Sequence, residues 1–332
     1  MPNLDKTILG KVDDENFGST FYVVDSDYRT AAQRWTLDDG TGPLDLWQQR
    51  NRGRVFYTSG GPITSYATDA AAFQAAVDAA VDYRGDKVYL TPGSYSIATA
   101  VSLDCANLRL MGPRSRHPRS ALVTVTATVD AAYSITAAGD DMEIAHHTVV
   151  PYTGTNFLDI TAGAHRGYLH HLFYDATGVT GSTSTEFCNG GAVNDWLVED
   201  CSFYVDAAQG DAFTLTSPVR WVWQRNDFMV GLTTIAWASV FTFATTPLGN
   251  IMRYNTFRGC GGATPAVFTN LVTGVANSNG QLMFYGNFID GTALTTASSF
   301  ETTFGTATDI EVAENYVTGD LAGEGGAVVA LG

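Results

Sequence analysis

The sequence predicts an all-β protein, a parallel β-helix of about nine turns or rungs. The main observation is a recurring motif: a small polar residue or histidine, then any residue, then a large apolar residue. The motif begins at seven positions that are 24 to 32 residues apart: His147, His171, Cys201, Asn226, Asn255, Asn287 and Asn315. A repeat period of roughly 20–50 residues indicates a solenoid, in which each turn stacks on its neighbours.

Apolar pairs upstream of the motif support the same fold. In most turns they lie three and five residues before the polar position, as Trp196 and Val198 do before Cys201. A spacing of two is the strand period, so each pair points to one face. Clusters of Gly, Ser, Thr and Asn supply the turns between strands. Like residues should then stack, which places four phenylalanines in one column: Phe173, Phe203, Phe228 and Phe257.

The first 60 residues do not follow the repeat and are rich in aromatic residues and arginine. A stretch of this length is too short for a sizeable core of its own, yet its aromatic side chains need burial. Two interpretations stay open: an attachment or oligomerisation arm that is buried against another chain, or a segment that packs back on its own solenoid. We therefore expect an arm at 1–60 and a β-helix at 61–332.

The clearest helix is predicted over 68–82, just before the first turn of the solenoid. Thr68 or Asp69 supplies its N-cap, and Phe73 and Val77 mark its apolar face. The open end of a solenoid exposes apolar core and unpaired strand groups. We expect the helix to cap that end.

This helix and the strand after it carry a recognisable pattern. The residues that match it are Asp69, Ala72, Phe73, Gln74, Ala76, Val77, Asp78, Ala80, Gly85, Val88, Tyr89, Leu90, Pro92, Gly93 and Tyr95. The pattern resembles the first segment of the pectate-lyase-like superfamily of right-handed parallel β-helices, and the Asn-x-apolar motifs from Asn226 onward fit it too. The resemblance covers roughly 68–332 and implies a right-handed solenoid. It implies no single activity, because the superfamily contains polysaccharide lyases, glycoside hydrolases, bacteriophage tailspikes and non-catalytic virion proteins.

The charge of the chain excludes several partners. Its net charge is −16, no lysine follows Lys87, and no lysine or arginine follows Arg258. Such a surface repels nucleic acid and anionic membranes, so we expect no nucleic-acid partner. We recognise no secretory signal and no apolar stretch long enough to cross a bilayer, and so expect no membrane insertion. No cofactor is expected.

Three acidic residues are candidates for catalysis. Glycoside hydrolases need two carboxyls about 5–10 Å apart, one of them with a raised pKa. Turns about 4.8 Å apart bring aligned outward residues within that range. The candidates are Glu199, Asp200 and Asp227. However, Arg225 and Gln224 align with Asp200 and Glu199 on the next turn, and an exposed ion pair of this kind catalyses nothing.

The histidines and tryptophans are candidates for binding. Four histidines form two doublets one turn apart, His146-His147 and His170-His171, and stacked imidazoles could bind a transition metal or titrate as a pair. Alternatively, His147 and His171 fill the ladder position that asparagine occupies later, and His146 and His170 face outward. We favour the ladder and expect no metal, since no carboxylate completes a ligand set by spacing. Trp196, Trp221 and Trp223 form a column that is either core or, if it faces outward, a platform for glycan binding. The ladder departs from asparagine within 142–212, so a special face is expected there.

The β-helix, the aromatic arm and the acidic surface together look most like a bacteriophage structural protein: a tailspike, tail fibre or head-surface component. On this interpretation the chain joins the virion in the host cytoplasm. It forms a homotrimer, contacts other virion proteins through residues 1–60 and presents its flank to a host-surface polysaccharide. Two alternatives stay open, a polysaccharide lyase or glycoside hydrolase of the β-helix class and a bacterial surface adhesin. The catalytic signatures of the superfamily's enzymes are not assembled in the sequence, which favours a non-enzymatic protein.

Overall fold

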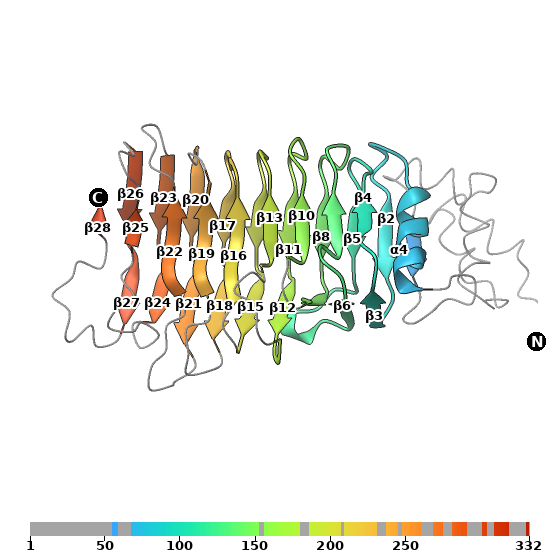
Figure 1. Cartoon of the computed structure of the whole chain (residues 1–332), viewed down its shortest axis with the longest axis horizontal. Coiled ribbons are helices and arrows are strands. Elements are labelled where there is room, and N and C mark those ends of the chain that lie inside the picture. Colours follow the sequence, from blue (N-terminus) through green and yellow to red (C-terminus); the bar gives the residue numbers. More distant parts are fainter. Residues whose placement is uncertain are drawn as a thin grey trace, which may run out of the picture.

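The computed structural model confirms the fold class: three parallel sheets run along the long axis of a β-helix (Figure 1). The structure describes residues 55–58, 68–152, 156–179, 186–206, 209–230, 237–244, 248–259, 268–274, 281–290, 301–303, 309–318 and 330–331. Within these ranges there is no helix with the length and apolar character needed to cross a bilayer.

Each turn of the β-helix contributes one strand to each sheet. Sheet A consists of β1 (Val55–Thr58), β2 (Lys87–Leu90), β5 (Arg109–Met111), β8 (Glu143–Ala145), β11 (Tyr168–His170), β14 (Leu197–Glu199), β17 (Val222–Gln224), β20 (Asn250–Arg253), β23 (Gln281–Tyr285) and β26 (Asp309–Ala313). Sheet B consists of β3 (Gly93–Ile97), β6 (Val123–Ala127), β9 (Thr148–Val150), β12 (Phe173–Ala176), β15 (Ser202–Val205), β18 (Asp227–Val230), β21 (Thr256–Gly259), β24 (Phe288–Asp290) and β27 (Tyr316–Thr318). Sheet C consists of β4 (Val101–Leu103), β7 (Tyr133–Ile135), β10 (Leu158–Ile160), β13 (Cys188–Gly190), β16 (Gln209–Leu215), β19 (Trp237–Phe243), β22 (Phe268–Gly274), β25 (Glu301–Thr303) and β28 (Ala330–Leu331).

From β8 onward, a two-residue turn joins sheet A to sheet B in each described turn of the solenoid. Its first residue has a φ between 51° and 62° at His146, His171, Asp200, Arg225, Tyr254, Gly286 and Glu314. This left-handed conformation redirects the backbone within one residue, and L-residues adopt it only where the surrounding structure compensates. We call these residues the turn column.

The second residue of the turn forms a ladder of buried asparagines in the later turns. The backbone N–H of Asn226, Asn255 and Asn287 donates to the side-chain oxygen of the asparagine on the next turn, at 2.9 to 3.0 Å. Each side-chain N–H in turn donates to a backbone carbonyl of the preceding turn, as from Asn255 to Trp223 at 3.0 Å. The ladder therefore satisfies buried backbone groups at the corner where the regular strand bonds stop.

One turn was placed incorrectly by the sequence pattern. Strand pairing aligns Tyr174 with both Val149 and Phe203, so the ladder residue of that turn is Leu172, and His171 belongs to the turn column. Phe173 is therefore not part of the buried phenylalanine column, and Tyr174 takes its place. This shift follows from the two-residue turn after His170. The first residue of that turn takes the left-handed conformation whether it is polar or apolar, so His171 takes the first position and Leu172 takes the ladder position.

The interior consists of stacked apolar columns. Phe203, Phe228 and Phe257 stack almost parallel, with ring centroids 4.7 and 5.1 Å apart. This geometry follows from the parallel register, which repeats the same inward position on every turn. A wholly buried stack of this kind fixes the distance between successive turns along sheet B.

The capping helix α4 (Asp69–Asp78) covers the first turn, as expected, with Phe73 and Val77 buried beneath it. It also satisfies two sheet edges. The Asp69 carboxylate accepts from Ser96 N in β3 at 2.7 Å, and the Gln74 amide forms hydrogen bonds with both backbone groups of Ser102 in β4. The helix ends four residues before the predicted 82, because the Asp86 carboxylate accepts from Val81 N at 2.9 Å.

Of the predicted arm at 1–60, the structure describes residues 55–58. These form β1, which pairs in parallel with β2 and extends sheet A by one strand. The rest of the arm, and the expectation that it attaches to a partner, lie outside the described residues.

Candidate functional site

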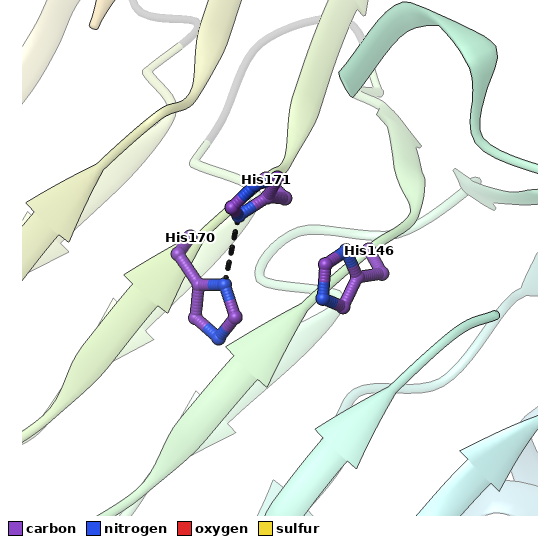
Figure 2. Close-up of side chains that lie close together, drawn as sticks. All are labelled: His146, His170 and His171. Atoms are coloured by element: carbon purple, nitrogen blue, oxygen red, sulfur yellow. Dashed lines mark hydrogen bonds between the residues drawn. The ribbon is translucent and has the colours of Figure 1, made fainter. Parts of the chain in front are cut away.

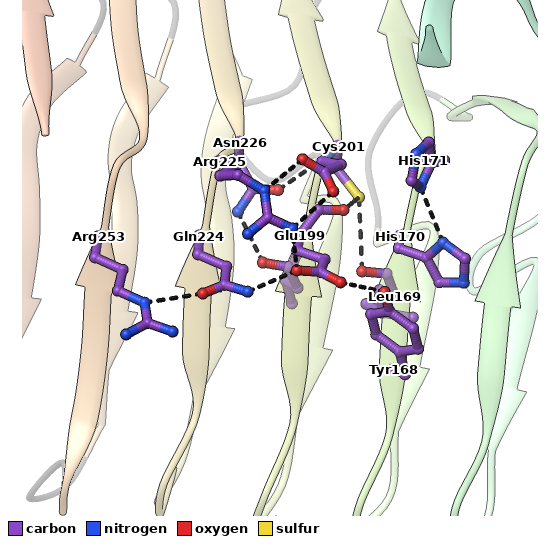
Figure 3. A network of polar contacts seen from close by, with 12 residues as sticks. Tyr168, Leu169, His170, His171, Glu199, Cys201, Gln224, Arg225, Asn226 and Arg253 are labelled. Atoms are coloured by element: carbon purple, nitrogen blue, oxygen red, sulfur yellow. Dashed lines mark hydrogen bonds and ion pairs between the residues drawn. The ribbon is translucent and has the colours of Figure 1, made fainter. Parts of the chain in front are cut away.

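The outer face of sheet A carries a polar network that spans several turns. Parallel pairing aligns the last outward residues of successive strands, so His170, Glu199, Gln224 and Arg253 form a row across four turns (Figure 3). The turn column runs beside this row and adds a second line of polar side chains. Two lines of side chains that repeat at about 4.8 Å form a continuous polar strip.

Glu199 is the centre of this network. It accepts hydrogen bonds from the Tyr168 hydroxyl, from Gln224 Nε2 at 2.6 Å and from Arg225. Asp200 accepts from Arg225 Nε at 2.8 Å and Nη2 at 2.9 Å, which is a two-pronged ion pair. The expected alignment of Asp200 with Arg225, and of Glu199 with Gln224, is confirmed.

These contacts hold both carboxylates ionised. Burial on its own would raise the pKa of Glu199, but the hydrogen bonds from Tyr168 and Gln224 and the charge of Arg225 bring that pKa below its usual range. Hydrogen bonding to Arg225 lowers the pKa of Asp200 in the same way. A general acid needs the opposite, a carboxyl that keeps its proton near neutral pH. Glu199 and Asp200 therefore lack the property that glycoside hydrolysis requires of its acid.

Asp227, the third catalytic candidate, lies on sheet B at the start of β18. Its carboxylate pairs with Arg258, whose Nε lies 3.0 Å from Oδ1. All three candidate carboxylates are thus bound by an arginine from the next turn.

Three histidines meet beside the network, at the corner between sheets A and B (Figure 2). His146 and His171 occupy consecutive places in the turn column, and His170 ends β11. Each offers one ring nitrogen such that these atoms lie within 4.8 Å of one another. His170 Nδ1 and His171 Nδ1 are 3.0 Å apart, and the other nitrogen of His170 lies 3.1 Å from Glu143 Oε1.

His147 takes no part in this cluster, and the expectation that His147 and His171 share a column is wrong. His147 lies wholly in the core at the ladder position, with Nδ1 3.0 Å from the Ala145 carbonyl. Burial lowers its pKa to about 4, which keeps its ring neutral. Burial and the neighbouring His170 and His171 also lower the pKa of His146 to about 4. The sequence identified the two doublets and placed His146 and His170 on the outside, but it did not place His171 with them, because the constant two-residue turn moves His171 out of the ladder.

The tryptophan column is core, and its interpretation as a glycan platform is wrong. Trp196, Trp221 and Trp223 are at most 1% exposed. The rings of Trp196 and Trp221 stack at 5.5 Å, and both indole N–H groups donate to backbone carbonyls of the preceding turn at 3.0 Å. These residues begin or continue the inward side of sheet A, where no sugar can reach them.

Exposed aromatic residues lie at a different place, one that the sequence analysis missed. Tyr254 is in the turn column directly after Arg253 and is 52% exposed. Its ring packs edge-on against Tyr285 of the next turn, with centroids 5.6 Å apart. In the sequence, the position directly before each ladder asparagine identifies a side chain that points outward. Tyr254 and Tyr285 extend the polar strip of sheet A with an aromatic surface.

A second carboxyl group with unusual properties lies at sheet C. Glu186 comes two residues before Cys188, and the register of β13 with β16 places it beside Asp211. Burial raises the pKa of Glu186 to about 7, and the charge of Asp211 adds to this effect. Glu186 therefore has the property that Glu199 and Asp200 lack. No sequence pattern identifies Glu186, because the cause of its raised pKa is partial burial beside another acid.

Comparisons with known proteins complete these observations. No family model matches the chain, and no curated protein matches it. Among solved structures, a pectin methylesterase from Aspergillus niger is similar at 12% identity and a TM-score of 0.45, over 83% of this chain and 89% of the other. The pectin methylesterase PemA from Erwinia chrysanthemi is similar at 12% identity and a TM-score of 0.44, over 72% and 78%. ORF18 of Geobacillus virus E2 is similar at 10% identity and a TM-score of 0.34, over 85% and 64%. These values give no ground for transferring an activity.

The raised pKa of Glu186 predicts a pH-dependent stability. The folded chain holds the Glu186 proton more tightly than the unfolded chain does, so stability is lost as the pH rises from 4.5 to about 7. Glu186→Gln should raise the free energy of unfolding at pH 8 by about 1–2 kcal/mol after allowance for solvent screening, and leave it unchanged at pH 4. Denaturant unfolding at both pH values measures this. Glu311→Gln, at an exposed site, is the control; equal effects of Glu186→Gln at both pH values would contradict the assignment.

Proposed function

We propose that this chain is a structural component of a bacteriophage particle, a tailspike, tail fibre or head-surface protein, whose sheet A face binds a host-surface glycan. The observation that carries the proposal is the pairing of all three catalytic carboxylates predicted from the sequence with an arginine from the next turn. Glu199, Asp200 and Asp227 are held in this way. Such pairs order a surface and present hydrogen-bonding groups, but they hold no proton for chemistry.

The strip from Arg253 to Tyr285 has the composition of a sugar-binding surface. Arg253 presents a guanidinium group, which the buried Gln224 orients by accepting a hydrogen bond of 2.8 Å from Arg253 Nε at its Oε1. Tyr254 offers an exposed ring next to them. Aromatic faces pack against the apolar faces of sugar rings while polar groups bind hydroxyls. An extended strip suits a polymer, because consecutive turns offer equivalent contacts.

The assignment to a particle rests on the sequence. The net charge of −16 and the aromatic, arginine-rich residues 1–60 suit a chain that joins an assembly through its N-terminal arm. We propose a homotrimer for the assembled form. The arm lies almost entirely outside the described residues, so attachment through residues 1–60 has to be tested on purified particles.

A second candidate function is polysaccharide cleavage, as a β-helix lyase or glycoside hydrolase. The observation that favours it is Glu186, whose pKa is raised to about 7 next to Asp211 on the following turn. A protonated carboxyl beside an ionised one is the arrangement from which glycosidases build acid and base. This candidate places the reaction at sheet C, away from the glycan strip of sheet A.

Purified particles test the structural role. The chain should be present at a fixed copy number by quantitative mass spectrometry, and a chain without residues 1–60 should be absent from particles while its remaining part is still made. Efficient incorporation of the shortened chain would rule out the arm as the anchor.

Glycan binding and cleavage separate the two candidate functions. On host-type capsular or O-antigen polysaccharide, we expect binding that weakens about 10-fold in Tyr254→Ala, a loss of about 1.4 kcal/mol within the range for aromatic contacts. Tyr83→Ala, at an exposed tyrosine beside the capping helix, is the matched control. Viscosity and reducing ends should not change. Cleavage that is lost in Glu186→Gln would establish the enzyme instead, and cleavage lost in Glu199→Gln would overturn the structural interpretation of the sheet A network.

A further inference from the structure

The histidine cluster lies where the buried ladder loses its polar contacts. Its three members come from two neighbouring turns: His146 follows β8, and His170 and His171 end β11 and begin the next corner. On the turn of His170 and His171 the ladder residue is Leu172, which has no polar side-chain atom to bond to the next turn. The corner between these turns therefore lacks the side-chain bonds that asparagines supply further along.

The spacing of the ring nitrogens of His170 and His171 fits one metal ion. Two nitrogens that each lie 2.0–2.1 Å from an ion are separated by about 2.9 Å at a right angle and about 3.3 Å at the tetrahedral angle. The 3.0 Å between His170 Nδ1 and His171 Nδ1 lies within this range. The third ligand atom, from His146, is within 4.8 Å of both, so a rotation of the His146 side chain has to bring it closer for all three to share one ion. The three rings lie together at this corner (Figure 2).

Two further observations point to a ligand. His146 is only 7% exposed, and its Nδ1 is buried without a hydrogen-bond partner. A buried polar atom without a partner is costly, and a bound ion removes that cost. His170 also presents its second nitrogen to Glu143 Oε1 at 3.1 Å, and Arg109 lies 3.3 Å from the same carboxylate. A carboxylate that orients the far nitrogen of a histidine is the usual outer contact of a metal-binding imidazole.

We propose that His146, His170 and His171 bind one divalent transition-metal ion, with Glu143 orienting His170. Three imidazoles select zinc, cobalt, nickel or copper and disfavour calcium and magnesium, which require oxygen ligands. The ion links β8 to β11 at the corner where Leu172 interrupts the ladder. With three protein ligands, one coordination position stays open to water or to a group from a bound molecule.

Cobalt titration of the untagged, full-length chain tests the proposal. One equivalent of Co²⁺ should give visible ligand-field bands, zinc should displace it, and metal should raise the melting temperature. His170→Asn and His171→Asn should abolish the bands, and Glu143→Gln should weaken affinity about 10–100-fold. Asparagine is chosen because it tolerates the left-handed turn. His147→Asn, at a ladder position, and His117→Asn, in an exposed loop, should bind as the unaltered chain does.

A footprint on the unaltered chain keeps the test independent of whether the variants fold. Zinc should protect the half-buried His171 from diethyl pyrocarbonate and leave the exposed His117 reactive. Absence of stoichiometric binding, bands that survive His171→Asn in a folded chain, or equal protection of His117 would each overturn the proposal.

Discussion

The corner between sheets A and B is the constraint on which the rest of the structure depends. At such corners in the later turns, a buried asparagine donates from its side chain to a backbone carbonyl of the preceding turn, and its backbone N–H donates to the side-chain oxygen of the asparagine on the next turn. Buried backbone groups need partners, and the strands cannot supply them where the chain changes direction. Because the asparagine binds in both directions, it holds the two-residue turn and the strand spacing in the later turns; the earlier turns keep the same two-residue geometry with His147, Leu172 and Cys201 at this position. The register of all outward side chains of sheet A follows from that.

The chemistry of the outer face is a consequence of this register. Identical positions on successive turns meet at about 4.8 Å, so an acid on one turn contacts whatever the next turn places above it. For Asp200 that residue is Arg225, and the result is an ion pair of two hydrogen bonds. For His146 it is His171, and the result is a group of imidazoles. Glu186 differs because burial raises its pKa and, among the described residues, no arginine offsets that rise; the charge of its aligned neighbour, Asp211, adds to the rise.

The sequence predicted the period, the capping helix and the Asp200–Arg225 pair, because each depends on spacing along the chain. It misplaced His171, since a polar-x-apolar pattern fits equally well one residue earlier when the ladder residue is leucine. It left the tryptophan column open, as period-two alternation identifies one face of a strand but does not say which face is inside. It placed His146 and His170 on the outer face but missed their association with His171, which needs both the register and the direction of each side chain. What could not be predicted is therefore which residue of a corner occupies the ladder position. At these corners the backbone geometry decides the position even when the residue there is apolar.

The corner ladder holds the arginine-paired surface of sheet A in register, and the proposed role in glycan recognition depends on that surface. The most direct test of this dependence is the denaturant unfolding of Asn255→Ala beside that of Asn189→Ala, an exposed asparagine on sheet C. Asn255→Ala leaves the Trp223 carbonyl and the Asn226 N–H without their side-chain partner. At about 1–3 kcal/mol for each buried group, it should destabilise the chain by about 2–5 kcal/mol, against less than about 0.5 kcal/mol for Asn189→Ala. Equal effects of the two substitutions would contradict the account.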